Sequence, residues 1–165
     1  MGGIWEQISS TVVAEFSDLN DVKELTRISL RLLVAALLGG LLGFEREQRG
    51  KSAGIKTHML VCIGAALFVL IPQQAGVISQ AELSRIMQGI IAGIGFLGAG
   101  AILKGDDEKN LKGLTTAAGI WLTAAIGVAA GLGRESSAIL CTLLALMVLL
   151  IIPKLAGLIG RKDNS

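Results

Sequence analysis

The residues whose types and spacing could carry chemistry gather in one short stretch, which begins at Glu45 and ends at His58. Glu45 stands four residues before Arg49, and Glu47 stands four before Lys51, so a helix that continues through them would pair each carboxylate with a cation. One interpretation is a solvated helix end, whose exposed ion pairs contribute about 0.2–0.5 kcal/mol each. The other is that Glu45, Glu47 and His58 converge at the mouth of a helix bundle, because polar groups held against a membrane tend to mark function.

A resident metal ion has little support in the sequence. His58 is the sole histidine, and both cysteines, Cys62 and Cys141, fall within long apolar segments, where we interpret them as small apolar residues and not as a metal site. Asp106, Asp107 and Glu108 could supply the oxygen ligands that magnesium prefers. Three adjacent acids in a loop are equally explained by solvation, so a magnesium site there is the less favoured alternative. We predict no metal and no cofactor.

No catalytic motif is present, because the sequence contains no GxSxG, HExxH or Walker loop and no paired carboxylates within an apolar segment. Gly93, Gly95 and Gly98 do satisfy the dinucleotide fingerprint GxGxxG. That fingerprint requires a strand before it and a helix that opens at it. Here the glycines lie within the uncharged run 86–103, so we expect neither a nucleotide site nor an enzyme.

The apolar segments contain few polar side chains, namely Gln88, Thr115, Thr116, Thr123 and Thr142. A threonine hydroxyl can donate to the backbone carbonyl one turn back, so these residues need no substrate to explain them. No segment has a central Asp, Glu, Lys or His, which an ion pump or proton-coupled carrier normally needs. A pore lined by backbone carbonyls needs no such charge. A passive conduit beside Gln88, Thr115 and Thr116 is therefore the alternative to a protein that transports nothing.

The elements that must position these residues are membrane-spanning helices. Mean hydropathy is +0.68 and only 17% of the 165 residues are charged, whereas soluble domains carry about 25%. A net charge of only +2 does not indicate a protein that binds nucleic acid. A span needs about 20 apolar residues, and five segments qualify: 28–44, 59–74, 86–103, 113–133 and 136–153. We expect an all-α polytopic membrane protein with five transmembrane helices.

Glycines are concentrated in the third of these segments, at positions 93, 95, 98 and 100. In a soluble helix each would cost about 1 kcal/mol relative to alanine. In a bilayer, glycines let helix backbones approach closely, and close packing is what associates helices there. We predict a compact glycine-packed bundle with this surface at its centre, and association with a second copy or with a membrane partner.

Positive charge predicts the orientation. The loops after the first and third segments and the tail together hold ten Lys or Arg residues, and the opposite side holds five. The positive-inside rule puts the richer side in the cytoplasm, with the N-terminus outside and the C-terminus inside. Residues 1–27 then form an extracytoplasmic segment, 28–153 the transmembrane domain and 154–165 a short cytoplasmic tail. Arg31 lies close enough to the start of the first span to extend toward the interface.

Within the N-terminal segment, apolar residues recur every four positions at Ile4, Ile8, Val12 and Phe16. This spacing predicts a helix with one apolar face. Such a helix could lie at the membrane surface with Trp5 as an interfacial anchor. The alternative is a frayed tail.

Four spaced motifs carry a resemblance to a known family: GFERE at 43–47, AGIKTH at 53–58, RIMQGIIAGIGFLGAG at 85–100 and GLTTAAGIW at 113–121. Over roughly residues 31–153, the chain resembles the MgtC/SapB family of bacterial inner-membrane proteins. The resemblance implies a compact membrane domain of about five helices, with links to magnesium limitation and acid stress. It also implies a regulator rather than a magnesium carrier, because the best-described member looks like one that restrains the F-type ATP synthase by binding its membrane part.

Carried over position by position, the family motif points to fifteen residues, which are Glu45, Arg46, Glu47, Gly54, Thr57, His58, Arg85, Gln88, Gly93, Gly95, Gly98, Gly100, Thr115, Thr116 and Trp121. Two departures from the family pattern stand out. Many members have a soluble C-terminal domain, whereas only residues 154–165 follow the last segment here. Lys56 stands where arginine is common, which keeps the charge but loses the planar fork that binds carboxylates.

Overall fold

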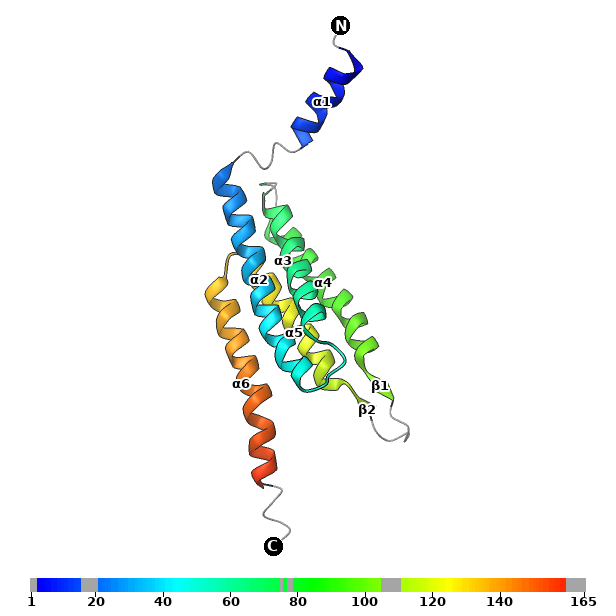
Figure 1. Cartoon of the computed structure of the whole chain (residues 1–165), viewed down its shortest axis with the longest axis vertical. Helices are drawn as coiled ribbons and strands as arrows, with labels where there is room; N and C mark the ends of the chain where they lie inside the picture. The colour runs from blue at the N-terminus through cyan, green and yellow to red at the C-terminus, as the bar shows by residue number, and fades with distance from the viewer. Residues whose placement is uncertain (1–2, 16–20, 75, 77–78, 105–110, 160–165) are drawn as a thin grey trace. The chain divides into compact units, whose positions relative to one another are not determined.

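The computed structural model describes residues 3–15, 21–74, 76, 79–104 and 111–159. Within these residues the chain forms six helices and one small antiparallel pairing (Figure 1). The helices are α1 (Ile4–Glu15), α2 (Val22–Gln48), α3 (Ile55–Gln74), α4 (Gln80–Ala101), α5 (Leu114–Gly131) and α6 (Glu135–Ile159). The two strands, β1 (Leu103–Lys104) and β2 (Leu111–Lys112), pair with Leu103 opposite Lys112. The all-α class is confirmed, and the short pairing between α4 and α5 was not predicted.

The chain divides into two compact units, Met1–Leu30 and Arg31–Ser165. In the first unit, α1 covers Ile4, Ile8 and Val12 of the predicted four-residue spacing, and all of its residues are exposed. Phe16, the fourth residue of that spacing, lies outside the described residues. The second unit contains α2 from Arg31 onward, together with α3 to α6. All of the candidate functional residues belong to this second unit.

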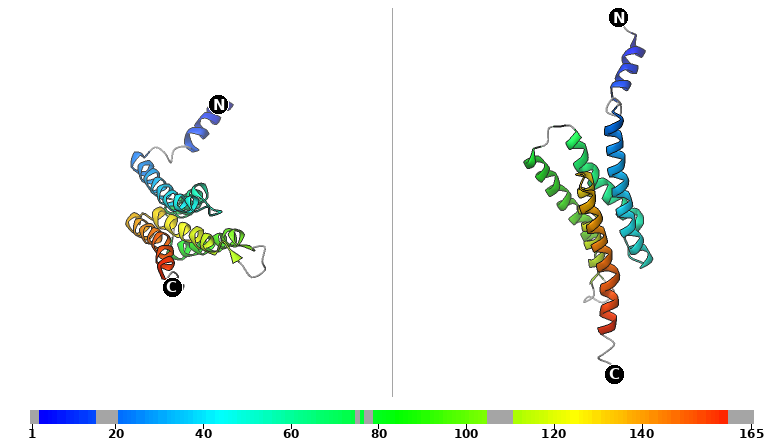
Figure 2. Two further views of the ribbon diagram at one scale, coloured as in Figure 1. Left: turned by 60° about the horizontal axis from the view of Figure 1, so that its bottom comes forward. Right: turned by 90° about the vertical axis from the view of Figure 1, so that its left-hand side faces the viewer.

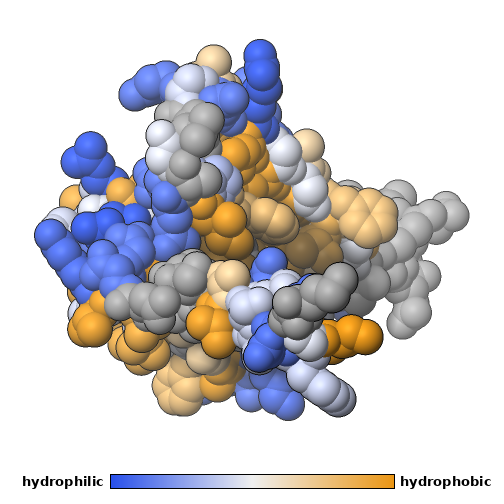
Figure 3. Space-filling model, turned by 90° about the horizontal axis from the view of Figure 1, so that it is seen from above, coloured by the Kyte–Doolittle hydropathy of each residue, from blue (hydrophilic) through white to orange (hydrophobic). Residues whose placement is uncertain are grey.

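Five helices, α2 to α6, are long and apolar enough to cross a membrane, as the sequence predicts. Many of their large apolar side chains are exposed. The space-filling view shows such side chains in orange on the surface, beside separate groups of hydrophilic residues in blue (Figure 3). A water-soluble surface rarely exposes apolar patches of that extent, which supports the membrane class.

Four of the five spans begin earlier than the apolar segments from which they were predicted, whereas α5 lies within its segment. α4 begins at Gln80 rather than Ile86 because Ser79 and Glu82 form a capping box. The Glu82 N–H donates to Ser79 Oγ at 3.2 Å, and the Ser79 N–H donates to Glu82 Oε2 at 2.7 Å. These bonds satisfy N–H groups that a helix start leaves without partners. Hydropathy alone does not register a cap, so the segment boundary was placed one and a half turns late.

The core of the second unit is built from small residues on α2, α3, α5 and α6. Its buried cluster comprises Ala35, Leu38, Leu42, Cys62, Ala66, Ile126, Ala130, Ala138 and Ala145. Thr123 and Thr142 donate to the carbonyls of Gly119 and Ala138, one turn back, as predicted. α4 contributes no residue to this cluster and lies at the edge of the bundle (Figures 1 and 2). Only 6% of the residues in the α4 span are buried, whereas 44% of those in the α5 span are buried.

Glycines do pack the bundle, but on α2 and α5. A Cβ at Gly39 would lie 2.7 Å from the His58 carbonyl oxygen, and one at Gly43 would lie 2.6 Å from Ile55 Cα. A Cβ at Gly127 or Gly131 would overlap a carbonyl oxygen of α3. Both α2 and α5 therefore approach the α3 backbone at distances that no side chain would allow.

The α4 glycines, by contrast, are not at the centre where the sequence predicted them. A Cβ added at Gly93, Gly95 or Gly100 would meet nothing within 4 Å. At Gly98 it would make only an ordinary contact, 3.6 Å from Ala117 Cβ. Because successive helical residues turn by about 100°, these glycines also face different directions and form no single surface.

Arg31 joins α2 to three other helices, α3, α5 and α6, at the end of the bundle where α5 ends. Its Nη1 donates to the Gly131 carbonyl at 2.9 Å and to Gln73 Oε1 at 3.3 Å. Its Nε lies 4.0 Å from Glu135 Oε1, at the start of α6. These partners are all at helix ends, and the expectation that Arg31 extends toward the membrane interface stays a prediction.

Gly113 fixes the turn that begins α5. Its φ of 95° lies in the left-handed region, and a Cβ at this position would overlap the Ala101 carbonyl oxygen. Only glycine satisfies both constraints without strain. The turn brings the start of α5 beside the end of α4.

Candidate functional site

The end of α2 meets the start of α3, and this junction buries two opposite charges. Glu45 is 6% exposed and Arg46 is 3% exposed. The guanidinium of Arg46 donates from Nε to Glu45 Oε2 and also contacts that oxygen through Nη2. Arg49 pairs with the other carboxylate oxygen, as the spacing predicts. Removal of Glu45 would leave the buried Arg46 charge uncompensated.

Glu47 closes the loop between α2 and α3. The Ile55 N–H donates to Glu47 Oε2 at 2.9 Å, which places a carboxylate at the start of α3, where the helix dipole favours negative charge. Gly54 is close enough that a Cβ there would overlap this carboxylate. The sequence predicted that Glu47 reaches Lys51, but its observed partner is the backbone of α3.

His58 lies in the first turn of α3 and is fully buried. Its Nδ1 lies 3.0 Å from the Gly54 carbonyl oxygen. Since a carbonyl oxygen can only accept, the geometry assigns the proton to Nδ1. Nε2 has no hydrogen-bond partner among the described residues. A Cβ at Gly119 of α5 would lie 3.5 Å from it.

Arg46, His58 and Thr115 line a half-open cavity of about 400 Å³ between α2, α3, α5 and α6. Thr115 is exposed in the first turn of α5, and the neighbouring Thr116 is buried. The other lining residues are Leu42, Ala118, Gly119, Leu122, Cys141, Leu144, Ala145, Val148 and Leu149. Small-molecule sites commonly combine such apolar walls with a few placed polar groups.

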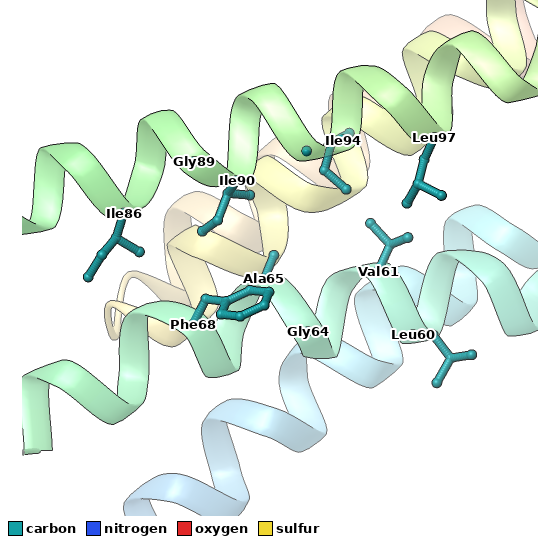
Figure 4. Close-up of a pocket in the computed structure, with 11 residues that line it drawn as sticks. Leu60, Val61, Gly64, Ala65, Phe68, Ile86, Gly89, Ile90, Ile94 and Leu97 are labelled. Carbon is teal, nitrogen blue, oxygen red and sulfur yellow. The ribbon is translucent and has the colours of Figure 1, made fainter.

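A second hollow, of about 650 Å³, separates α3 from α4 and has apolar walls. Figure 4 shows Ile86, Ile90 and Ile94 on α4 facing the α3 residues Val61 and Phe68 across this groove. Gly89 and Gly93 form part of the α4 wall, and Gly64 forms part of the α3 wall. The groove lies between membrane-spanning helices, so in the bilayer it is open to lipid or to another helix.

The structure therefore brings together one group of the predicted site residues: Glu45, Arg46, Glu47, Gly54, His58, Thr115 and Thr116. Thr57 is exposed nearby and lines a smaller hollow with Gly100. Glu45 and His58 are both buried where α2 ends and α3 begins, while Glu47 is exposed there.

The remaining predicted residues lie elsewhere. Arg85 and Gln88 are exposed near the start of α4, at the end of the bundle opposite the α2–α3 junction. Trp121 is 49% exposed and faces α4 residues across a third hollow. Gln88 lines none of the hollows described here, so the conduit beside Gln88, Thr115 and Thr116 stays a prediction.

Asp106, Asp107 and Glu108, the acids considered for magnesium, lie outside the described residues. Within the residues that the structure does describe, no group of three or more His, Cys, Asp or Glu side chains is placed to hold a metal ion.

The residues that line the His58 cavity on α5 and α6 were, apart from Thr115, not predicted from the sequence as site residues. Gly119 belongs to the fourth family motif but was not selected, and Cys141 was interpreted only as a small apolar residue. The four-residue spacing of Gly39 and Gly43 was a signal for close approach to another helix. It was overlooked because the glycines of the third segment are more numerous.

Comparison with known proteins decides the family. Residues 32–158 match the model of the MgtC family. The chain belongs to the MgtC family. This MgtC family protein is accordingly a multi-pass membrane protein whose matched region runs from α2 into α6. No solved structure matches it.

Curated relatives agree with the family. Protein SrpB of Synechococcus elongatus is 45% identical over 132 residues, which cover 74% of this chain and 72% of SrpB. YhiD of Escherichia coli K12, whose name provisionally assigns it as a magnesium transporter, is 42% identical over 140 residues. Those residues cover 81% of this chain and 64% of YhiD. Protein MgtC of Salmonella typhimurium LT2 is 41% identical over 132 residues, 80% of this chain and 55% of MgtC.

Proposed function

We propose that this MgtC family protein is a non-catalytic regulator of the bacterial inner membrane that acts by helix-to-helix contact with a membrane partner. The observation that carries the proposal is the groove between α3 and α4. α4 is the least buried of the five spans. A Cβ added at Gly89 or Gly93, the glycines on its groove side, would have no described atom within 4 Å.

The groove suits a transmembrane helix for a physical reason. Lipid tails are as apolar as leucine, so helices in a bilayer associate through close packing rather than through the hydrophobic effect. Gly89 and Gly93 on one wall and Gly64 on the other leave the backbone accessible. A partner helix could therefore approach α3 and α4 as closely as α2 and α5 approach α3.

The partner that the family resemblance implies is the membrane part of the F-type ATP synthase, under magnesium limitation or acid stress. Restraint of that enzyme requires contact and no chemistry, which fits a protein in which Glu45, Glu47 and Glu82 are engaged in ion pairs or at helix starts. We therefore propose the membrane part of the F-type ATP synthase as the partner. A second copy of the chain is the other occupant that the groove would accept.

Gly93→Leu tests the proposal. The leucine would project into the groove without touching its own bundle, so membrane insertion and stability should be retained while co-purification of the ATP synthase membrane sector is lost. Gly64→Leu should act in the same way from the opposite wall.

Gly95→Leu is the matched control, because Gly95 is equally open but does not line the groove. Co-purification from detergent-solubilised membranes, followed by immunoblotting, gives the readout. Loss of the partner in the Gly95 variant alone would place the contact on another face of α4. Unchanged recovery in both groove variants would remove the proposal.

The proposed orientation places the α2–α3 junction and the end of α6 in the cytoplasm, from the ten positive charges on that side against five. A fluorescent protein that folds only in the cytoplasm, fused after Ser165, should therefore be bright. Periplasmic alkaline phosphatase at the same position should be inactive. The reverse pair of results would invert the topology.

A passive magnesium conduit is the second candidate, and the name given to YhiD favours it. Purified protein in liposomes distinguishes the two candidates. Magnesium influx that rises with the amount of folded protein would establish a conduit, and influx equal to that of empty liposomes supports the regulator.

A further inference from the structure

The His58 cavity contains a buried hydrogen-bond acceptor that none of the described residues satisfies. A neutral imidazole that donates from Nδ1 keeps a lone pair at Nε2, and that atom is buried without a hydrogen-bond partner. Buried polar atoms are nearly always bonded. A ligand in this cavity that carries a hydroxyl or amine hydrogen would supply the missing donor.

The same cavity offers positive charge. Arg46 lines it, and a guanidinium has more N–H donors than the single carboxylate of Glu45 takes up. Residues 45–56 contain four cations, Arg46, Arg49, Lys51 and Lys56, against two carboxylates, so the junction has an excess of two positive charges. Glu45 and Glu47 are already engaged by ion pairs and by the α3 backbone. An anionic ligand would be favoured.

The remaining walls are apolar and extend away from the polar end along α6, from Leu149 and Val148 toward Leu144, because α6 begins beside Arg31 at the opposite end of the bundle. These positions lie within a membrane-spanning helix. A ligand that combines an anionic head, a hydrogen-bond donor and an alkyl tail matches all three features. Basic pockets between transmembrane helices are known to bind the head groups of anionic lipids.

We infer that this cavity binds one anionic glycerophospholipid from the adjacent leaflet, with its phosphate near Arg46, a head-group hydroxyl donating to His58 Nε2 and an acyl chain against α6. Phosphatidylglycerol is the bacterial lipid class with this chemistry. The inference is independent of the proposed docking of a partner on α4, because the two hollows share no lining residue.

Cys141 reports occupancy directly, since it lines the cavity and is partly exposed, whereas Cys62 is fully buried and should not react. The protein is placed in nanodiscs of phosphatidylcholine alone or of an equal mixture with phosphatidylglycerol. Maleimide should label Cys141 about fivefold more slowly in the mixed nanodiscs. Equal rates would overturn the inference, as would equal protection by soluble glycerol 3-phosphate in phosphatidylcholine nanodiscs.

Ala118→Leu and Ala125→Leu form a matched pair, because both alanines are exposed on α5 but only Ala118 lines this cavity. Native mass spectrometry after extraction from the mixed nanodiscs should show one phosphatidylglycerol retained by the wild type and by Ala125→Leu. Ala118→Leu should lose it while keeping the wild-type melting temperature. Retention of the lipid by Ala118→Leu would place it elsewhere and overturn the assignment.

Discussion

Replacement of Glu45 by glutamine is expected to lower the free energy of unfolding by about 3–5 kcal/mol. The carboxylate neutralises Arg46, which is 3% exposed, and it also binds Arg49. Glutamine keeps the shape of the side chain but leaves the guanidinium charged and buried. The loss should therefore exceed the 0.2–0.5 kcal/mol that an exposed helical ion pair contributes.

Thermal unfolding of the detergent-solubilised protein, followed by size-exclusion chromatography, measures this effect. Glu47→Gln is the control on the same helix, because Glu47 is exposed and the glutamine amide oxygen can still accept from the Ile55 N–H. Only the negative charge at the start of α3 is lost, which should cost about 0.3–1 kcal/mol. Adding Arg46→Leu to Glu45→Gln should recover part of the stability, since no unpaired charge is then left buried. A Glu45→Gln protein as stable as the wild type would mean that the ion pair is solvated.

Gly127→Ala is expected to destabilise the bundle by about 1–3 kcal/mol through overpacking. The added methyl group would overlap the Cys62 carbonyl oxygen and lie 3.0 Å from Ala65 Cβ, so α5 must move away from α3. A backbone oxygen cannot rotate aside as a flexible side chain does.

Gly93→Ala provides the opposite expectation, because a Cβ there meets nothing within 4 Å. Its higher helix propensity should leave stability unchanged or raise it by about 0.5–1 kcal/mol. The two variants are compared by their melting temperatures in one detergent and by the yield of monodisperse protein. A loss at Gly93 that equals the loss at Gly127 would show that α4 is packed as tightly as α5.

Some features of this protein follow from the sequence alone. Apolar segments of about 20 residues predicted five spans, because a bilayer requires a helix of that length to satisfy its own backbone. The four-residue spacing of Glu45 and Arg49 predicted their ion pair, because helical neighbours are set by local geometry. The spaced motifs predicted the family, which the match over residues 32–158 confirms.

Other features depended on which helices pack together, and composition does not encode that. The glycines of α4 look like the most prominent packing surface in the sequence, yet the helices that approach α3 closely are α2 and α5, through Gly39 and Gly127. Glycine permits close approach wherever a partner exists, but only tertiary structure decides where the partner is. For the same reason, the sequence identified His58 as a candidate, and only the fold placed its unpartnered Nε2 against Gly119, which is 61 residues away in the chain.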